Sequence, residues 1–335
     1  MITLYSLENS SGASVELSSL GAGIIAVRVP DKEGNIENVA LSYGNPSDYM
    51  ADGPCMGKIP GRYANRISKG HLDIEGEVYQ LSINNGPNAL HGGPSGFQNH
   101  IWDSEMIPNG VRFTYHSKDG EENYPGNLTV TAEYVWSEEN VLTLTLKAKT
   151  DKTTVVNLTN HTYFNLDGAD SGSVLKHRMK LKASKYLPTD ETQIPTGEFA
   201  EVKNTPMDFM SLKELGKDIN VDYVPLKIGK GYDHCWVIDE WEKGKFVEEA
   251  VVLEAAESGR VLTISSTQPG VQIYTGNWLS GSPQNCSGKS YEDYDGVAIE
   301  MQGFPDAPNK PGFPSQILKP GEEYKEIIRF AFTVL

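Results

Sequence analysis

The stretch that decides the fold is Val141-Leu-Thr-Leu-Thr-Leu-Lys-Ala-Lys-Thr150, in which apolar and polar side chains alternate. Successive side chains of a β-strand point to opposite faces, so this alternation predicts a strand with one buried face. The residues expected to face the core are Leu142, Leu144, Leu146 and Ala148.

Further strands are expected on both sides of this stretch. Residues 250–255 and 261–266 flank a Glu-Ser-Gly-Arg sequence, which is typical of a hairpin with a glycine in its turn. A single short helix is expected at 211–216, where Ser211 is the N-cap and Glu214 follows three residues later. We therefore expect one all-β domain over residues 1–335, with many antiparallel strands and long functional loops. The other expected strands are 14–17, 24–29, 270–276 and 326–335.

The charge balance excludes several classes of partner. The chain has 335 residues with 45 Asp+Glu and 29 Lys+Arg, which gives a formal net charge of -16. A nucleic-acid partner and a membrane surface are both anionic, so neither is expected. The cysteines Cys55, Cys235 and Cys286 form no CxxC pair and are odd in number, and the N-terminus has no apolar signal segment. We therefore expect a cytoplasmic protein.

Short motifs that resemble nucleotide or calcium sites do not fit their structural context. Gly21-Ala-Gly-Ile-Ile-Ala26 matches a dinucleotide-binding pattern, but a β-branched run and Pro30 follow it instead of a helix. Gly288-Lys-Ser290 lacks the first glycine of a P-loop, because Pro283 stands at that position. Asp293-Tyr-Asp295-Gly296 lacks carboxylates at both ends of a calcium loop.

Polar residues instead gather in separate islands that also contain aromatic residues and glycine. Each island alone has an ordinary structural explanation. Together they supply a carboxylate, histidines, an arginine, amides and aromatic rings, which suit a neutral polyhydroxylated ligand. The islands are residues 61–67, 88–93, 157–166, 298–309 and, less strongly, 231–236.

Three residues are candidates for proton transfer. Glu300 ends an apolar run, so it points either into a cleft or toward the polar face of an exposed strand. His161 lies among asparagines and Tyr163, where it is either a general acid–base or a buried, hydrogen-bonded histidine. His91 precedes two glycines that would let a ligand approach closely. No spacing such as HxH or HxxxH supports a metal site.

Other residues are candidates for binding hydroxyl groups. Asn65 and Arg66 form a short, donor-rich pair, although a single arginine in an acidic chain is usually paired on the surface. Asp233 could accept two sugar hydroxyls, and the alternative is an Asx-turn. The residues alone do not establish that these islands meet in space.

At these islands the sequence resembles the aldose 1-epimerase family. The resemblance is carried by Gly-Arg-Tyr-Ala-Asn-Arg-Ile, Leu-His-Gly-Gly, Asn-His-Thr-Tyr-Phe-Asn-Leu, Tyr-Asp-His, and Glu-Met-Gln with Pro-Asp-Ala-Pro-Asn. It implies a large antiparallel β-sandwich with few short helices, whose concave face holds a neutral monosaccharide, and it implies no cofactor and no metal. In this reading His71 and His100 are structural.

The resemblance also implies a role for each candidate residue. Glu300 would be the general base that takes the O1 proton, and His161 the general acid that protonates the ring oxygen. His91 would contact the ring or anomeric oxygens. This mechanism requires an ionised Glu300 and a protonated His161, and we expect their proximity to favour both charges. The residues implied to bind hydroxyl groups are Arg66, Asn65, Asp233 and Gln272.

Three alternative functions remain open at this stage. A hexose-6-phosphate 1-epimerase would need a cluster of cations, which the acidic balance disfavours. A glycoside hydrolase usually needs two carboxylates at the scissile bond, and only Glu300 is a strong candidate. A non-catalytic sugar-binding protein would use the same cleft. The preferred aldose is not predicted, and the expected oligomeric state is a monomer or homodimer.

Overall fold

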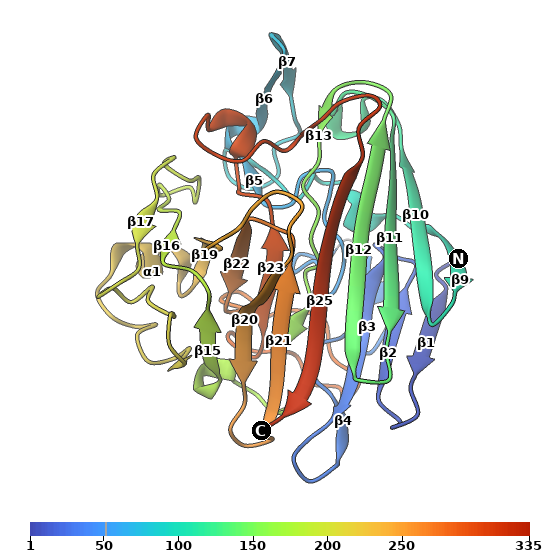
Figure 1. Cartoon of the computed structure of the whole chain (residues 1–335), viewed down its shortest axis with the longest axis vertical. Coiled ribbons are helices and arrows are strands. Elements are labelled where there is room, and N and C mark those ends of the chain that lie inside the picture. Colours follow the sequence, from blue (N-terminus) through green and yellow to red (C-terminus); the bar gives the residue numbers. More distant parts are fainter. Residues whose placement is uncertain (51) are drawn as a thin grey trace.

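Antiparallel strands dominate the computed structural model, which describes residues 1–50 and 52–335 (Figure 1). The largest sheet of the described residues has nine strands, and its long central members lie side by side in Figure 1. Its order is β18 (Lys213–Glu214), β15 (Arg178–Leu181), β20 (Val247–Glu254), β21 (Arg260–Ser266), β25 (Tyr324–Val334), β12 (Val141–Thr150), β11 (Leu128–Trp136), β10 (Gly110–Ser117) and β9 (Asp103–Ile107).

The predicted alternation along residues 141–150 is confirmed in β12. Leu142, Leu144 and Leu146 are fully buried, whereas the threonines and lysines between them are partly exposed. The neighbouring strands β11 and β25 continue this pattern, with Leu144 opposite Tyr134 on one side and Ile328 on the other. The large sheet therefore has one face in the core.

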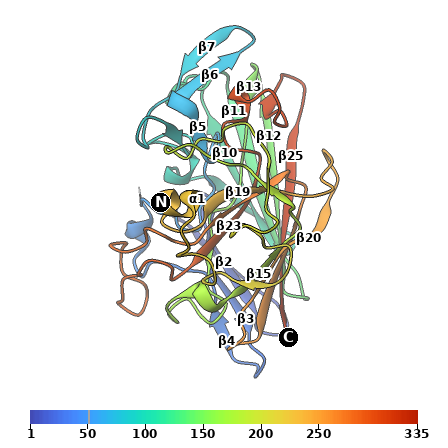
Figure 2. The ribbon, with the colours of Figure 1, turned by 90° about the vertical axis from the view of Figure 1, so that its left-hand side faces the viewer.

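A second sheet provides the other layer. Figure 2, turned by 90°, shows β19 and β23 to one side of β12 and β25. One large hydrophobic cluster joins the layers, with members from Leu7 near the N-terminus to Phe332 near the C-terminus. The order of this sheet is β14 (Tyr163–Phe164), β23 (Val297–Gln302), β22 (Gly270–Tyr274), β19 (Asp233–Val237), β16 (Lys185–Tyr186) and β17 (Ala200–Glu201).

Smaller elements complete the fold. A four-stranded sheet of the described residues contains β1 (Leu4–Glu8), β2 (Ser14–Ser18), β3 (Gly23–Pro30) and β4 (Ile36–Asn38). Two-stranded pairs are β5 (Arg66–Ile67) with β8 (Ala89–Leu90), β6 (His71–Ile74) with β7 (Glu77–Gln80), and β13 (Thr154–Val155) with β24 (Ile317–Leu318). The predicted all-β antiparallel architecture is thus confirmed.

The helix expected at 211–216 is wrong. Lys213 and Glu214 form β18, which pairs with β15 at the edge of the large sheet. A capping signal is a weak local preference, and pairing with an existing strand outweighs it here. The helix α1 instead spans Val224–Gly229, with a proline near its start and Lys230 in the left-handed conformation at its end. No helix in the described part of the chain is long and apolar enough to cross a membrane.

Candidate active site

The register of three neighbouring strands places the polar candidates on one face of the second sheet. Gln272 of β22 lies opposite Glu300 of β23, and Asp233 of β19 lies opposite Tyr274 of β22. Directly paired residues point to the same side, and residues two apart along a strand share that side. The intervening side chains, such as Ile273 and Ile299, point into the core. The alternation of side chains along these strands therefore places the polar candidates on one face of the sheet and the core residues on the other.

A cavity of about 360 Å³ opens over this face. It is wide enough for a ligand of monosaccharide size, because small-molecule sites usually enclose about 300–1,000 Å³. Of the residues predicted from the sequence, only Gln272 is not among those that line the cavity. Gln272 lies behind Asp233 and donates a 2.7 Å hydrogen bond from Nε2 to its Oδ1. The predicted residues that line the cavity are Asn65, Arg66, His91, His161, Asp233 and Glu300.

Glu300 and His161 form the centre of this cavity. Nε2 of His161 lies 3.5 Å from Oε1 of Glu300, and both side chains are buried. The backbone of His161 is fixed, because its N–H donates to the carbonyl of Lys58 and its carbonyl accepts from Gly57. Within the described residues, His161 Nδ1 and Glu300 Oε2 have no hydrogen-bond partner. Buried polar atoms are rarely left this way, so both are available to a ligand.

Burial acts against the charged forms that the sequence led us to expect for this pair. Removal from water lowers the pKa of His161 to about 4, although the field of Asp233 opposes this shift. Burial, with the added effect of Asp233, raises the pKa of Glu300 well above its usual value. Burial therefore outweighs the effect that we expected from the proximity of the two groups in the ligand-free site. Burial thus disfavours the charged form of each group in the ligand-free site.

His91 is fixed as a hydrogen-bond donor. Its ring Nδ1 accepts the backbone N–H of Asn65 at 3.1 Å, and the backbone N–H of His91 donates to the carbonyl of Asn65. Burial lowers the pKa of His91 well below its usual value, so the ring is neutral. A neutral ring that accepts at Nδ1 carries its proton at Nε2. His91 meets His161 edge to face, with ring centroids 5.3 Å apart, and therefore offers an N–H donor beside the acid–base pair.

The same three side chains have a geometry that could hold a metal ion. One donor atom from each of His91, His161 and Glu300 lies within 4.8 Å of the others. A metal would need the lone pair of His91 Nε2, but the hydrogen bond from Asn65 leaves the proton on that nitrogen. The donor set therefore fits an oxygen acceptor on a ligand better than it fits a cation.

Arg66 and Asp233 form the polar wall of the cavity. Arg66 donates from Nε to Asn85 at 3.1 Å and from Nη2 to Gln193 at 2.5 Å. Asp233 accepts from Gln193 at 2.7 Å. Asn65 lines the cavity beside them, and its Oδ1 accepts the backbone N–H of Arg66. This wall alternates donors and acceptors, as recognition of hydroxyl groups requires.

Comparison with known proteins decides the family. A family model described as aldose 1-epimerase matches residues 3–331. The chain belongs to the aldose 1-epimerase family. Galactose mutarotase from Bos taurus is 42% identical over 96% of this chain and 91% of its own length. Aldose 1-epimerase from Escherichia coli is 36% identical over 98% of this chain and 94% of its own length.

A solved structure supports the same membership in the aldose 1-epimerase family. The aldose epimerase homologue from C. elegans superposes with a TM-score of 0.91 at 28% identity, and the match covers 100% of both chains. The predicted large antiparallel β-sandwich is therefore confirmed as the fold of this family member.

Several residues that line the cavity were not predicted from the sequence. Gln193 and Asn85 lie in loops outside the polar islands, and no motif marks them. Trp278 stands at the rim with 65% of its surface exposed, and Nζ of Lys230 lies 4.4 Å from its ring centroid. In the sequence, the one signal for this rim is a tryptophan that follows Tyr274 by four residues.

His71 and His100 lie away from the cavity. His71 is exposed at the start of β6. His100 stacks on Tyr115 at 4.8 Å, and its Nε2 lies 3.0 Å from the carbonyl oxygen of Ser95. Neither side chain is among those that line the site.

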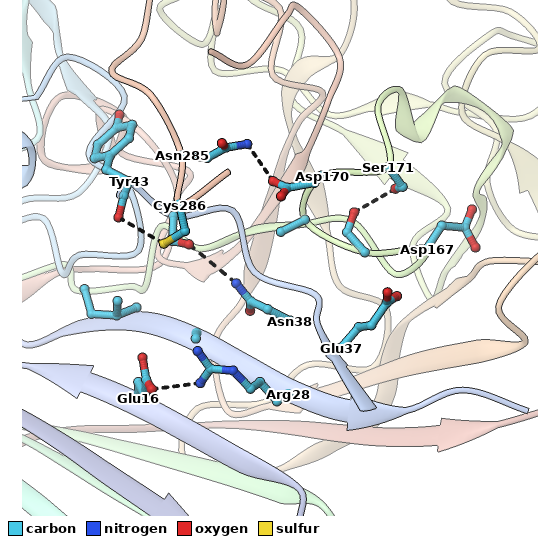
Figure 3. Close-up of a pocket in the computed structure, with 15 residues that line it drawn as sticks. Glu16, Arg28, Glu37, Asn38, Tyr43, Asp167, Asp170, Ser171, Asn285 and Cys286 are labelled. Atoms are coloured by element: carbon cyan, nitrogen blue, oxygen red, sulfur yellow. Dashed lines mark hydrogen bonds and ion pairs between the residues drawn. The ribbon is translucent and has the colours of Figure 1, made fainter. Parts of the chain in front are cut away.

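A second cavity, of about 430 Å³, lies beside β2, β3 and β4 (Figure 3). Its charged groups are largely paired within the protein, as for Arg28 with Glu16 at 2.8 Å. Asp170 likewise accepts from Asn285 at 2.5 Å. The described residues that line it include no histidine. It therefore lacks the acid–base pair of the first cavity.

Proposed function

We propose that the protein is a mutarotase that interconverts the α and β anomers of free aldohexoses such as glucose and galactose. The observation that carries this proposal is the close pair of Glu300 and His161, each with a buried atom that lacks a hydrogen-bond partner, in a cavity walled by polar side chains. Membership in the aldose 1-epimerase family supports it independently.

The reaction needs only two proton transfers. The anomeric O1–H proton passes to the carboxylate of Glu300, and the imidazolium of His161 delivers a proton to ring O5 as the C1–O5 bond breaks. The open-chain aldehyde then rotates about C1–C2, and ring closure returns both protons with the roles reversed. Each positioned acid or base contributes about 10²–10⁴-fold to such a reaction.

Because burial favours the neutral carboxyl group, Glu300 can supply the proton that this mechanism places on His161. Its transfer from Glu300 to His161 covers the 3.5 Å gap between Oε1 and Nε2. A sugar hydroxyl that donates to the carboxylate stabilises its charged form and so favours this transfer. The N–H of His91 can then stabilise negative charge on a sugar oxygen. Substrate binding thus creates the reactive charges that burial disfavours in the empty site.

A sugar phosphate fits the cavity less well than a neutral sugar. Among the described residues that line the cavity, Arg66 is the one cationic side chain, and Asn85 and Gln193 already accept its hydrogen bonds. Phosphate recognition usually needs several charge-assisted hydrogen bonds. Glycoside hydrolysis is disfavoured too, because the second carboxylate, Asp233, is held by two side-chain amides.

Polarimetry on freshly dissolved α-D-glucose and α-D-galactose tests the proposal. We expect wild-type protein to accelerate the approach to the equilibrium rotation, and to do so much less with glucose 6-phosphate. No acceleration above buffer would overturn the assignment. Saturable sugar binding without interconversion of the anomers would instead establish a non-catalytic sugar-binding protein.

We further propose a cytoplasmic location, a single domain over residues 1–335, and a monomer or homodimer. Cell fractionation tests the location, and light scattering coupled to size-exclusion chromatography tests the oligomeric state. Limited proteolysis that releases a stable folded fragment would contradict the single domain.

A further inference from the structure

An amide separates the two charged groups of the polar wall. Nη2 of Arg66 and Oδ2 of Asp233 are 3.9 Å apart, which is too far for a direct hydrogen bond. Gln193 bridges them, because its Oε1 accepts from Arg66 at 2.5 Å and its Nε2 donates to Asp233 at 2.7 Å. Gln193 lies in a loop far from both residues in the sequence, and it lines the cavity.

We propose that Gln193 is a positioning residue that keeps Arg66 and Asp233 from pairing directly, so that both remain able to bind sugar hydroxyls. This inference rests on the proposed function, which it deepens. A direct arginine–carboxylate pair is commonly bidentate and uses two donors and two acceptors at once. With the amide between them, each charged group makes one hydrogen bond to Gln193.

The loop that carries Gln193 is built to hold it in place. Oδ1 of Asp190 accepts the backbone N–H groups of Thr192 and Ile194, at 2.8 and 3.1 Å. The carbonyl of Thr192 accepts from the buried side chain of Asn88 at 3.2 Å, which ties the loop to the island that contains His91. Such Asx-turn bonding fixes a loop locally.

The backbone of Gln193 also has an uncommon conformation. Its φ is +64°, in the left-handed region that residues other than glycine rarely adopt. Backbone conformations of this kind persist where the surrounding structure determines them, and they cluster at ligand sites. In this conformation the side chain of Gln193 lies between Arg66 and Asp233 and bonds to both.

A neutral amide is the side-chain type that this position requires. It donates at one end and accepts at the other, so it satisfies a cation and an anion together. A glutamate here would place a second carboxylate against Asp233, and a methionine would fill the same space without either hydrogen bond. In Gln193→Met, neither Arg66 nor Asp233 keeps its hydrogen bond to residue 193, so each charged group is left to seek the other across the 3.9 Å gap, and such pairing would use the groups that face the sugar.

The test compares Gln193→Met with a matched change in the same loop, Glu191→Gln, whose side chain is exposed. Anomerisation of glucose and galactose is followed by polarimetry, and sugar binding by calorimetry. We expect Gln193→Met to raise KM and Kd about tenfold with kcat within about threefold, which corresponds to about 1.4 kcal/mol of binding free energy. Glu191→Gln should match the wild type.

The inference would be overturned if Gln193→Met and wild type had equal KM and Kd. A tenfold loss of kcat with KM unchanged would also overturn it. Thermal unfolding within a few degrees of wild type excludes a general loss of structure. If wild-type protein binds sugar but does not interconvert anomers, the proposed function fails while the Kd comparison still decides the role of Gln193.

Discussion

Nε2 of His161 lies 3.5 Å from Oε1 of Glu300, and neither side chain has more than 6% of its surface exposed. At this distance the two groups can exchange a proton with small movements. Because burial disfavours both charges, the neutral form of the pair is favoured until a ligand supplies hydrogen bonds. General acid–base chemistry by Glu300 and His161 can therefore begin when a polar ligand enters the cavity and stabilises their charged forms.

Glu300→Gln is expected to lower kcat about 10²–10⁴-fold, because the amide keeps the shape and neutrality of the protonated carboxyl group but cannot accept a proton. Folding should be preserved, since the ligand-free site already favours the uncharged carboxyl. Polarimetry with glucose gives the rate. The matched control is Glu254→Gln, whose carboxylate pairs with Arg178 at 2.7 Å. Full activity in Glu300→Gln would contradict its assignment as the base.

His177 should make the protein acid-labile. Its ring is buried, its Nε2 accepts the N–H of Leu166 at 2.9 Å, and burial lowers its pKa to about 4. The folded state therefore binds fewer protons than the unfolded state between pH 6.5 and about 4. Over that window, stability should fall by about 1.4 kcal/mol per pH unit from this residue as the pH decreases.

The check is urea unfolding of wild type and His177→Gln at several pH values. A glutamine can still accept the N–H of Leu166 but does not titrate. The difference in unfolding free energy between the two proteins should change with pH between 6.5 and 4 and level off above 7. Parallel curves over the whole range would show that His177 is not the group responsible. His116→Gln, at an exposed position, is the control.

The strands were predictable from the sequence because one face of the large sheet is buried and the other is not. Leu142, Leu144 and Leu146 follow that alternation along the whole of β12. β23 is buried on both faces, so its sequence does not alternate, and the direction in which Glu300 points was open until the register with Gln272 was known.

The sequence did not allow prediction of the protonation states of His161 and Glu300, or of the bridge that Gln193 forms between Arg66 and Asp233. Whether His161 and Glu300 stabilise each other as ions depends on how completely they leave water, and that is a property of the folded packing. Gln193 reaches Arg66 from 127 positions away, and only the fold brings its loop to the cavity. The helix expected at Ser211 failed because tertiary strand pairing outweighed a local capping signal.

Lys58→Met is expected to destabilise the protein by about 3–5 kcal/mol, because it leaves a buried carboxylate without its partner. Lys58 and Asp52 form an ion pair with no exposed side-chain surface, and Lys58 also donates to the carbonyl of Tyr49 at 2.6 Å. Chemical denaturation gives the loss. Lys149→Met, which removes an exposed pair with Glu323, should change stability little. Adding Asp52→Asn to Lys58→Met should restore part of the stability.

Trp278 should report sugar binding directly. Its indole ring lines the rim of the cavity, and it is the one tryptophan among the exposed large apolar residues of the described chain. The apolar face of a sugar stacks on such a ring, which contributes about 1 kcal/mol. Addition of glucose or galactose to wild-type protein is therefore expected to change its tryptophan emission in a saturable way.

The change in emission should be lost in Trp278→Phe and retained in Trp241→Phe, because Trp241 does not line this cavity. Trp278→Ala should raise KM a few-fold and leave kcat nearly unchanged, since the ring lies at the rim while Glu300 and His161 carry out the proton transfers. Retention of the full emission change in Trp278→Phe would place the reporting tryptophan elsewhere. A large fall in kcat for Trp278→Ala would mean that the ring helps to order the reacting groups as well as to bind the sugar.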